Sequence, residues 1–324
     1  MFDKNTSIFF QKENLTASTT TDNLREGKAA EIASRLKLSW PLGKPIPYGV
    51  RIVLGSGDHP TEIKYEVEVS FIQHIDENNL FRIDKKQVYI NETLPDLVAD
   101  QLAYEVGTVF YPLVVALDHE GAFVGIANQT EIRERWPKHK LGILDYFEGD
   151  VVEEYLRIFE DKLYNDSDIN MAFLNDWFIA SFFATLYKDY GHSYLVNSYF
   201  RFPNVTSFAV DGYSVNQQLE GNYNHFGAIT LVHQGIAHEE DPISGETNAV
   251  GTYSACYTLH PRFRHIISLI ANYQYRGTQD TKVYIHLIPP EGLDVDYDFM
   301  DKDRSEPLSE KKTGRSFLQK LFDH

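Results

Sequence analysis

The densest group of potential metal ligands lies at the end of an apolar stretch, where His233 and His238 are followed by Glu239. Zinc sites need histidine nitrogens and carboxylate oxygens that converge at tetrahedral angles. Residues five apart on a strand point to opposite faces, so the two histidines converge only if the chain bends near Gly235. His225, in the preceding turn, is a third histidine within reach. These four residues are the candidate ligands of a metal-dependent hydrolase; otherwise they form the polar end of a strand.

Other residues with catalytic potential occur in patterns typical of structural roles. The segments 58–59 and 118–120 each place an aspartate beside a histidine, the combination that general acid–base catalysis uses. Both lie in predicted turns, where aspartate is common. Cys256 is the single cysteine, and its position between Ala255 and Tyr257 in an apolar strand predicts a buried, unreactive thiol.

The remaining sequence motifs argue against an enzyme. Asp294, Asp296 and Asp298 imitate the start of a calcium-binding loop, but Phe299 and Ser305 stand where the loop needs glycine and glutamate. The sequence contains no nucleophile elbow, no phosphate-binding loop and no dinucleotide-binding fingerprint. We therefore expect a protein without catalytic residues and without a cofactor.

Composition and charge narrow the class of protein further. Hydrophobic residues make up 43% of the 324 positions, which excludes a wholly disordered chain. The formal net charge is −17, and the sequence lacks the basic patch that a nucleic-acid binder would need. Residues 1–21 show no basic region followed by an apolar one, so no secretion signal is predicted. Together with the single cysteine, this pattern favours a soluble cytoplasmic protein.

The most clearly specified structural unit is a hairpin followed by a helix. Apolar stretches at 109–117 and 122–127 flank a turn, which predicts two paired strands. Asn128 is placed to cap the following helix, with Glu131 as its capping-box partner. Strict alternation of apolar and polar residues at 63–71 predicts an earlier strand with one solvated face, which is typical of an antiparallel sheet.

The middle of the chain shows helical periodicity, most clearly at 94–106 and 151–163. Residues 171–187 are apolar nearly all round, but this segment contains Asn175 and Asp176 and is shorter than the roughly 20 residues that a membrane span needs. We therefore expect a continuous helix buried at the centre of the domain, and no insertion into a membrane.

From residue 194 onward the apolar period returns to two, and short turns between strands favour a meander. The predicted strands are 194–202, 207–213, 226–237, 250–259, 265–275 and 282–288. The expected fold is α+β, with an antiparallel sheet, curved or of open-barrel type, and a central helical segment packed against it. The expected regions are an extension at 1–45, a strand, hairpin and helix region at 46–190, a β-meander at 191–290 that extends the same sheet or forms a second one, and a charged tail at 291–324.

The tail ends in an amphipathic peptide, which is the strongest interaction signal in the sequence. Such a peptide can dock in a groove of a protein partner or fold back onto its own domain. With no catalytic motif elsewhere, the leading hypothesis is a non-enzymatic structural or adaptor protein of a multi-protein assembly. The expected partner-binding residues are Phe317, Leu318, Leu321 and Phe322.

The second hypothesis is a carrier of an apolar small molecule or lipid. Its cavity would lie between the sheet and the helix predicted at 171–187. The many tyrosines and phenylalanines of the C-terminal strands would line this cavity or, as is more common, form a core. The order of sheet, helices and further sheet is similar in architecture to open-barrel carriers of apolar ligands, although no residue motif supports that similarity.

Overall fold

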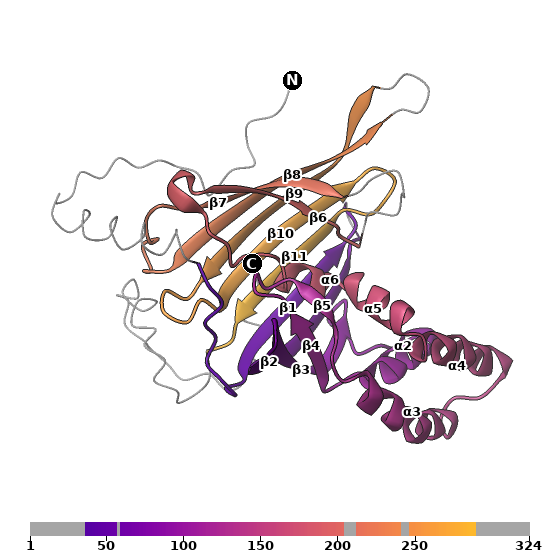
Figure 1. Cartoon of the computed structure of the whole chain (residues 1–324). Coiled ribbons are helices and arrows are strands. Elements are labelled where there is room, and N and C mark those ends of the chain that lie inside the picture. Colours follow the sequence, from indigo (N-terminus) through magenta and orange to yellow (C-terminus); the bar gives the residue numbers. More distant parts are fainter. Residues whose placement is uncertain (1–35, 57–58, 204–211, 241–245, 290–324) are drawn as a thin grey trace, which may run out of the picture.

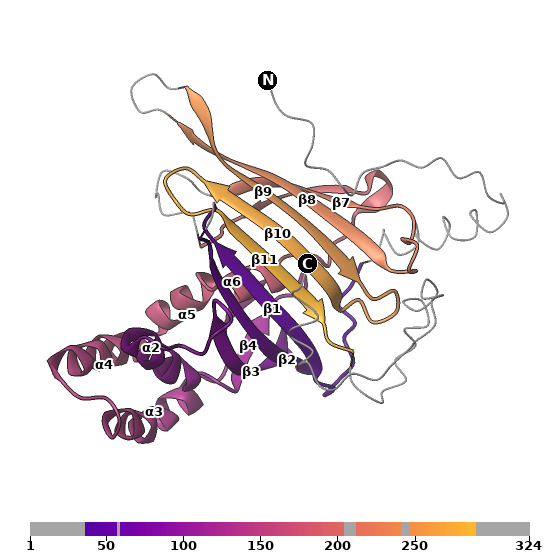
Figure 2. The ribbon, with the colours of Figure 1, turned by 180° about the vertical axis from the view of Figure 1, so that it is seen from behind.

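The structure, a computed structural model of the chain, describes residues 36–56, 59–203, 212–240 and 246–289 (Figure 1). Within these residues, an antiparallel sheet of 11 strands runs in the order β5-β4-β3-β2-β1-β11-β10-β9-β8-β7-β6. Two meanders therefore meet where the first strand pairs with the last, and Figure 2 shows β1 and β11 side by side near the middle of the sheet. The predicted α+β class with a curved antiparallel sheet is confirmed, and both predicted strand regions belong to one sheet.

The first meander confirms the predicted hairpin. Its turn is held by Asp118, whose carboxylate accepts the backbone N–H groups of Glu120 and Ala122 at 2.9 Å each. Gly121 completes the turn with a φ of +91°, a conformation that glycine adopts without strain. The strands are β1 (Ile46–Leu54), β2 (Thr61–Ile75), β3 (Asn78–Ile90), β4 (Leu113–Leu117) and β5 (Phe123–Ile126).

The second meander contains one strand that the sequence pattern missed. Residues 214–219 follow the predicted strand at 207–213 and carry mostly polar side chains, yet they form β7. Val215, Gln217 and Leu219 face inward there, and the alternation of burial is complete. The strands are β6 (Leu195–Phe200), β7 (Tyr213–Leu219), β8 (Ile229–Glu240), β9 (Thr247–Leu259), β10 (Ile266–Tyr275) and β11 (Thr281–Leu287).

Helix α2 lies between β3 and β4, and α3 to α6 connect the two meanders; some helix ends differ from the predicted ones. The first helix begins at Val98 rather than near Leu94, which is exposed. Asn128 stands at the N-cap of α3 but does not cap it; its side-chain oxygen instead accepts the N–H of Val114 at 2.9 Å and so anchors β4. The helices are α2 (Val98–Thr108), α3 (Gln129–Leu144), α4 (Asp150–Leu163), α5 (Asp166–Leu174) and α6 (Trp177–Phe182).

The continuous helix predicted at 171–187 is wrong, because the chain breaks into α5 and α6 at Asn175 and Asp176. The Asp176 carboxylate accepts the N–H of Ile179 at 2.9 Å and so caps a new helix, which is the usual role of aspartate at this position. The Asn165 side chain caps the preceding helix, since it accepts two backbone N–H groups of α5. In the described part of the chain, no helix is long and apolar enough to cross a membrane.

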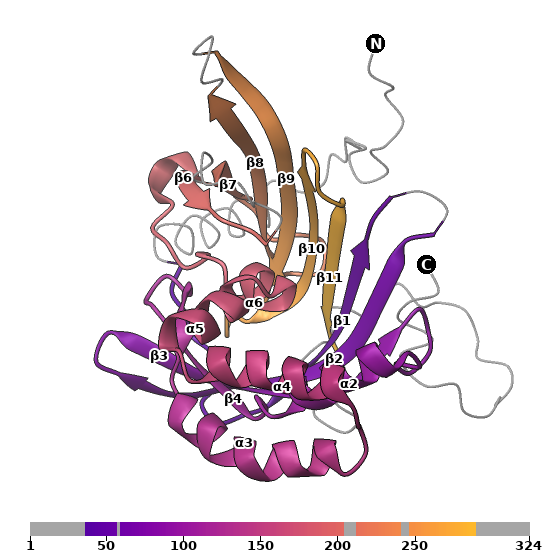
Figure 3. The ribbon, with the colours of Figure 1, turned by 90° about the vertical axis from the view of Figure 1, so that its right-hand side faces the viewer.

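The hollow of the curved sheet is filled by α6 (Figure 3). The Tyr257 hydroxyl donates to the Ser181 carbonyl at 2.9 Å, and the Ser181 and Tyr273 hydroxyls lie 2.8 Å apart. These tyrosines are buried, so the C-terminal aromatic residues form a core beneath the helix instead of lining an open cavity. Cys256 alternates with these inward residues and is exposed on the outer face, so the prediction of a buried thiol is wrong.

Candidate functional site

A pocket of about 700 Å³ opens where β3 meets α2 and the junction of α5 and α6. This volume lies in the range of about 300–1,000 Å³ that is typical of small-molecule sites. Part of the wall is aromatic, since the rings of Phe110 and Phe173 meet edge to face at 5.1 Å. The other apolar side chains of the wall include Ile63, Val88, Ile90 and Tyr111.

A bulge in β3 shapes the sheet side of this pocket. Val67 pairs with Lys85 and Tyr65 pairs with Val88, so β3 carries one extra residue between these pairs. Because a bulge shifts the alternation of side chains, Lys85 and Val88 can both face the inner side although they are three residues apart. Lys85 thus continues the inward series that begins with the buried Phe81 and Ile83.

Lys85 is the unusual residue of the pocket wall. Its Nζ lies 4.0 Å from the centroid of the Tyr65 ring and 5.9 Å from that of Tyr111, which are cation–π distances. Burial lowers the pKa of Lys85, and the negative charge of Asp176 offsets part of that effect. Within the described residues, the Lys85 ammonium makes no hydrogen bond and no ion pair, so it is available to a ligand.

Two tyrosines and a carboxylate complete the surroundings of Lys85. Burial, and then the charge of Asp176, raise the pKa of Tyr65 and Tyr111 above the usual value for a phenol. Both phenols are therefore protonated and neutral at physiological pH. Asp176 lines the same pocket, and one of its carboxylate oxygens accepts the N–H of Ile179 at the N-terminus of α6. A ligand here would meet the Lys85 ammonium, the carboxylates of Asp100 and Asp176, neutral rings and aliphatic groups.

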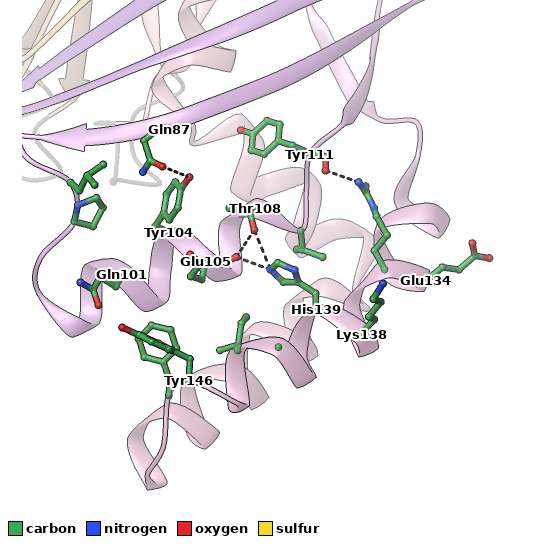
Figure 4. Close-up of a pocket in the computed structure, with 17 residues that line it drawn as sticks. Gln87, Gln101, Tyr104, Glu105, Thr108, Tyr111, Glu134, Lys138, His139 and Tyr146 are labelled. Atoms are coloured by element: carbon green, nitrogen blue, oxygen red, sulfur yellow. Dashed lines mark hydrogen bonds between the residues drawn. The ribbon is translucent and has the colours of Figure 1, made fainter.

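A second pocket, of about 980 Å³, lies on the other side of α2, between this helix and α3 (Figure 4). The Tyr104 hydroxyl donates to the Gln87 side chain at 3.3 Å. His139 Nε2 lies 2.7 Å from the Glu105 carbonyl oxygen and 3.2 Å from the Thr108 hydroxyl. These polar groups are already paired with one another, whereas Lys85 is not. We therefore place the candidate site in the first pocket.

The structure does not bring the four candidate metal ligands together. His233 is buried on the inner face of β8, whereas His238 is exposed on the outer face, as their five-residue spacing on an extended strand requires. Glu239 pairs with Arg276, and the exposed His225 ring lies against the neighbouring Phe226 ring at an interplanar angle of 44°. Among the described residues, no group of three or more histidine, cysteine, aspartate or glutamate side chains is placed to hold a metal ion.

His238 instead lines a third pocket, of about 630 Å³, on the outer face of strands β7 to β11. Its wall is formed largely by uncharged polar side chains such as Asn216, Gln234, Ser254 and Asn272. Side chains of this kind are typical of the solvated face of an antiparallel sheet. The predicted partner-binding residues Phe317, Leu318, Leu321 and Phe322, like the aspartates at 294–298, lie outside the described residues.

The residues around Lys85 were not identified from the sequence pattern. The sequence nevertheless contains a pattern that indicates Lys85. The inward-facing positions of this strand alternate through Phe81, Ile83 and Lys85, so a lysine stands where the next apolar residue would be expected. A lysine seldom lies on a buried face unless it has a partner or a function. In the sequence, Asp176 is a polar residue inside an apolar segment, and this position does not indicate a pocket.

No protein-family model matches this chain, and no curated protein sequence matches it. Among solved structures, the chain is similar to one titled for lipid–protein interactions in lipovitellin, with a TM-score of 0.39 and 10% identity over 76% of this chain. The chain spans only 25% of the length of that lipovitellin chain. A LolA superfamily protein from Nitrosomonas europaea aligns with 84% of this chain and 96% of its own, at a TM-score of 0.22 and 10% identity. Similarities this weak assign the chain to no family.

Proposed function

We propose that this protein binds an apolar small molecule in the pocket between β3, α2 and the junction of α5 and α6. The observation that supports the proposal is a pocket of about 700 Å³ with a largely apolar wall, formed by secondary-structure elements that meet there. Apolar surface gains roughly 25 cal/mol per Å² when it leaves water, so such a wall favours a hydrocarbon ligand. A carrier would use this pocket to hold its ligand.

The position of the pocket refines the carrier hypothesis. The predicted cavity was expected between the sheet and the whole segment 171–187, but the surface beneath α6 is packed with buried rings such as Phe178 and Phe182. The observed space lies beside the C-terminal end of α5, next to Ala172 and Phe173. A ligand would therefore bind beside the core and would not replace it.

The adaptor hypothesis remains a prediction. It depends on the peptide at 316–322, which lies outside the described residues. The two hypotheses are compatible, since a carrier can also dock on a partner through its tail. A metal-dependent hydrolase has no support from the arrangement of its four candidate ligands.

We expect the protein purified from its native host to carry a ligand. The measurement is a native mass spectrum compared with a spectrum of the denatured protein, because denaturation releases a molecule that only the folded pocket holds. A mass difference that disappears on denaturation, and an apolar molecule in the organic extract, would support the carrier function. Identical masses would argue that the pocket is empty in the cell.

A pair of glycine substitutions tests which pocket binds the ligand. Gly107 in α2 lines the first pocket and Gly142 in α3 lines the second, and a Cβ atom built on either one meets no heavy atom within 4 Å. Gly107→Phe should fill the first pocket and weaken the binding of decanol at least tenfold, whereas Gly142→Phe should leave it unchanged. Calorimetric titration with decanol measures both. The reverse pattern would move the site to the pocket between α2 and α3.

Both substitutions should preserve the fold. Each replaces a glycine inside a helix with a residue of higher helix propensity, and glycine costs about 1 kcal/mol relative to alanine at such positions. The thermal midpoints of the two variants therefore provide a matched control for folding.

A further inference from the structure

Lys85 differs from the neighbouring lysines of the sheet because, within the described residues, it has no carboxylate partner. Lys86, the next residue on β3, pairs with Glu68 at 3.0 Å and with Glu66 at 3.5 Å. Lys64 on the adjacent strand pairs with Glu62 at 2.9 Å and also with Glu92. The surrounding sheet is thus rich in carboxylates, but the inward direction of Lys85 keeps its ammonium in the pocket.

An unpaired ammonium in such a place has an energetic cost. Taking a charge out of water is unfavourable unless a partner or hydrogen bonds compensate, and buried lysines are therefore usually paired. The rings of Tyr65 and Tyr111 supply part of this compensation through their π faces. A negatively charged group on the ligand would supply the rest, and a charge-assisted hydrogen bond is among the strongest that proteins form.

The other charges that line the pocket limit how much negative charge the ligand can bring. Two of these charges are compensated by ion pairs, since Asp84 pairs with Arg82 at 2.7 Å and Lys86 pairs with Glu68 at 3.0 Å. Asp100 and Asp176 line the same pocket and form no ion pair with another described residue. A head group with two negative charges would pair one of them with Lys85 and leave the other facing these two carboxylates. One negative charge therefore fits the pocket better than two.

We propose that the ligand is an amphipathic carboxylate, with its head group on the Lys85 ammonium and its hydrocarbon part against Val88, Phe110 and Phe173. This inference depends on the proposed function, because it assigns the head group of a molecule bound in the same pocket. Tyr111 also lines this pocket, and its neutral phenol is an additional hydrogen-bond donor for the carboxylate.

The test compares ligands that share one hydrocarbon chain and differ in the head group. Decanoate, decanol, decylamine and decyl phosphate are titrated calorimetrically into the full-length protein below their aggregation concentrations. Decanoate should bind about tenfold to a hundredfold more tightly than decanol, as expected for a hydrogen bond to a charged group. Decylamine should bind most weakly of the four, and decyl phosphate should bind less tightly than decanoate.

Substitution of the lysine should remove this preference. Lys85→Met should bind decanoate and decanol with similar affinity, and its decanol affinity should stay close to that of the wild type. Lys282→Met is the matched control, because Lys282 is an exposed lysine on the outer face of β11 in the same sheet. It should leave the whole series unchanged. Without ligand, the Lys85→Met variant should unfold at the same temperature as the wild type or higher, because an unpaired charge is lost.

The outcomes separate the two proposals. If decanol and decanoate bind the wild type equally well, the head-group assignment is overturned and the apolar carrier function stands. If none of the four compounds binds, both proposals fail. Tighter binding of decyl phosphate than of decanoate would overturn the assignment of a single charge. The wild-type comparison decides these points even if the Lys85 variant does not fold.

Discussion

Lowering the pH from about 7 to about 5 is expected to reduce the free energy of unfolding by roughly 2 kcal/mol through each of two buried histidines, in addition to the loss through His260. His233 is buried with Nδ1 3.1 Å from the Tyr253 hydroxyl oxygen, and in the described part of the chain its Nε2 has no hydrogen-bond partner. His265 is 3% exposed, and within the described residues neither of its ring nitrogens has a hydrogen-bond partner. Both rings are therefore held in the neutral form.

The sign of this effect follows from the two pKa values. Burial lowers the pKa of His233 and of His265 from 6.5 to about 3. Nearby positive charges act in the same direction, from Lys188 on His233 and from His260 and Lys44 on His265. Below pH 6.5 the unfolded chain takes up protons that the folded chain does not. The stability is therefore complete above about pH 6.5 and declines progressively as the pH falls toward about 3.

Denaturant unfolding at several pH values measures this decline. His265→Phe removes one of the two groups and keeps a ring that can stack as the imidazole does on His260. This variant should remove roughly 2 kcal/mol of the loss between pH 7 and 5. The matched substitution of the exposed His192 should leave the dependence as it is. A wild-type stability that stays constant down to pH 5 would contradict the burial of both imidazoles in their neutral form.

Local sequence patterns predicted the sheet better than they predicted the helices that cross it. Apolar and polar residues alternate over 63–71 and 250–259, which predicts one buried face for each strand. In the sheet, the apolar residues of these strands lie mainly on the inner face. Asn128 shows why local patterns fail for some helix ends. Its side chain accepts the N–H of Val114 in β4 instead of an N–H of its own helix, and the local sequence around residue 128 does not indicate this long-range hydrogen bond. Asp176 likewise breaks a segment whose hydrophobicity alone favours a single helix, since an N-cap partner outweighs the continuity of apolar residues.

The candidate site was harder to predict because it depends on distant segments. Lys85 comes from β3, Phe110 follows α2, and Phe173 and Asp176 come from α5 and its junction with α6. These residues surround one pocket only because β3 pairs with β2 and β4 and because the chain breaks between α5 and α6. The sequence pattern instead predicted metal ligands among the histidines near His233. Because side chains alternate along a single strand, these potential ligands lie on opposite faces of β8.

Replacing Phe182 with alanine is expected to cost about 3–5 kcal/mol, the usual range for a buried phenylalanine. Phe182 is 3% exposed and is the last residue of α6. Its ring centroid lies 4.9 Å from those of Tyr48 and Phe178 and 6.0 Å from that of Trp40. The side chain therefore joins the helix to β1 at the centre of the sheet and to the segment that precedes it.

The expected loss also follows from the length of α6, which contains 6 residues. A helix this short is not stable in water by itself, so its order depends on packing against the sheet. Denaturant unfolding of Phe182→Ala measures the loss, and Ile270→Ala is the control because Ile270 lies on the outer face of β10 and is 37% exposed. The control should change the stability by less than about 1 kcal/mol, in line with exposed positions generally.

A Phe182 variant as stable as this control would mean that α6 does not hold the two halves of the curved sheet together. In that case the junction of α5 and α6, and with it the position of Asp176 beside Lys85, would need another source of rigidity.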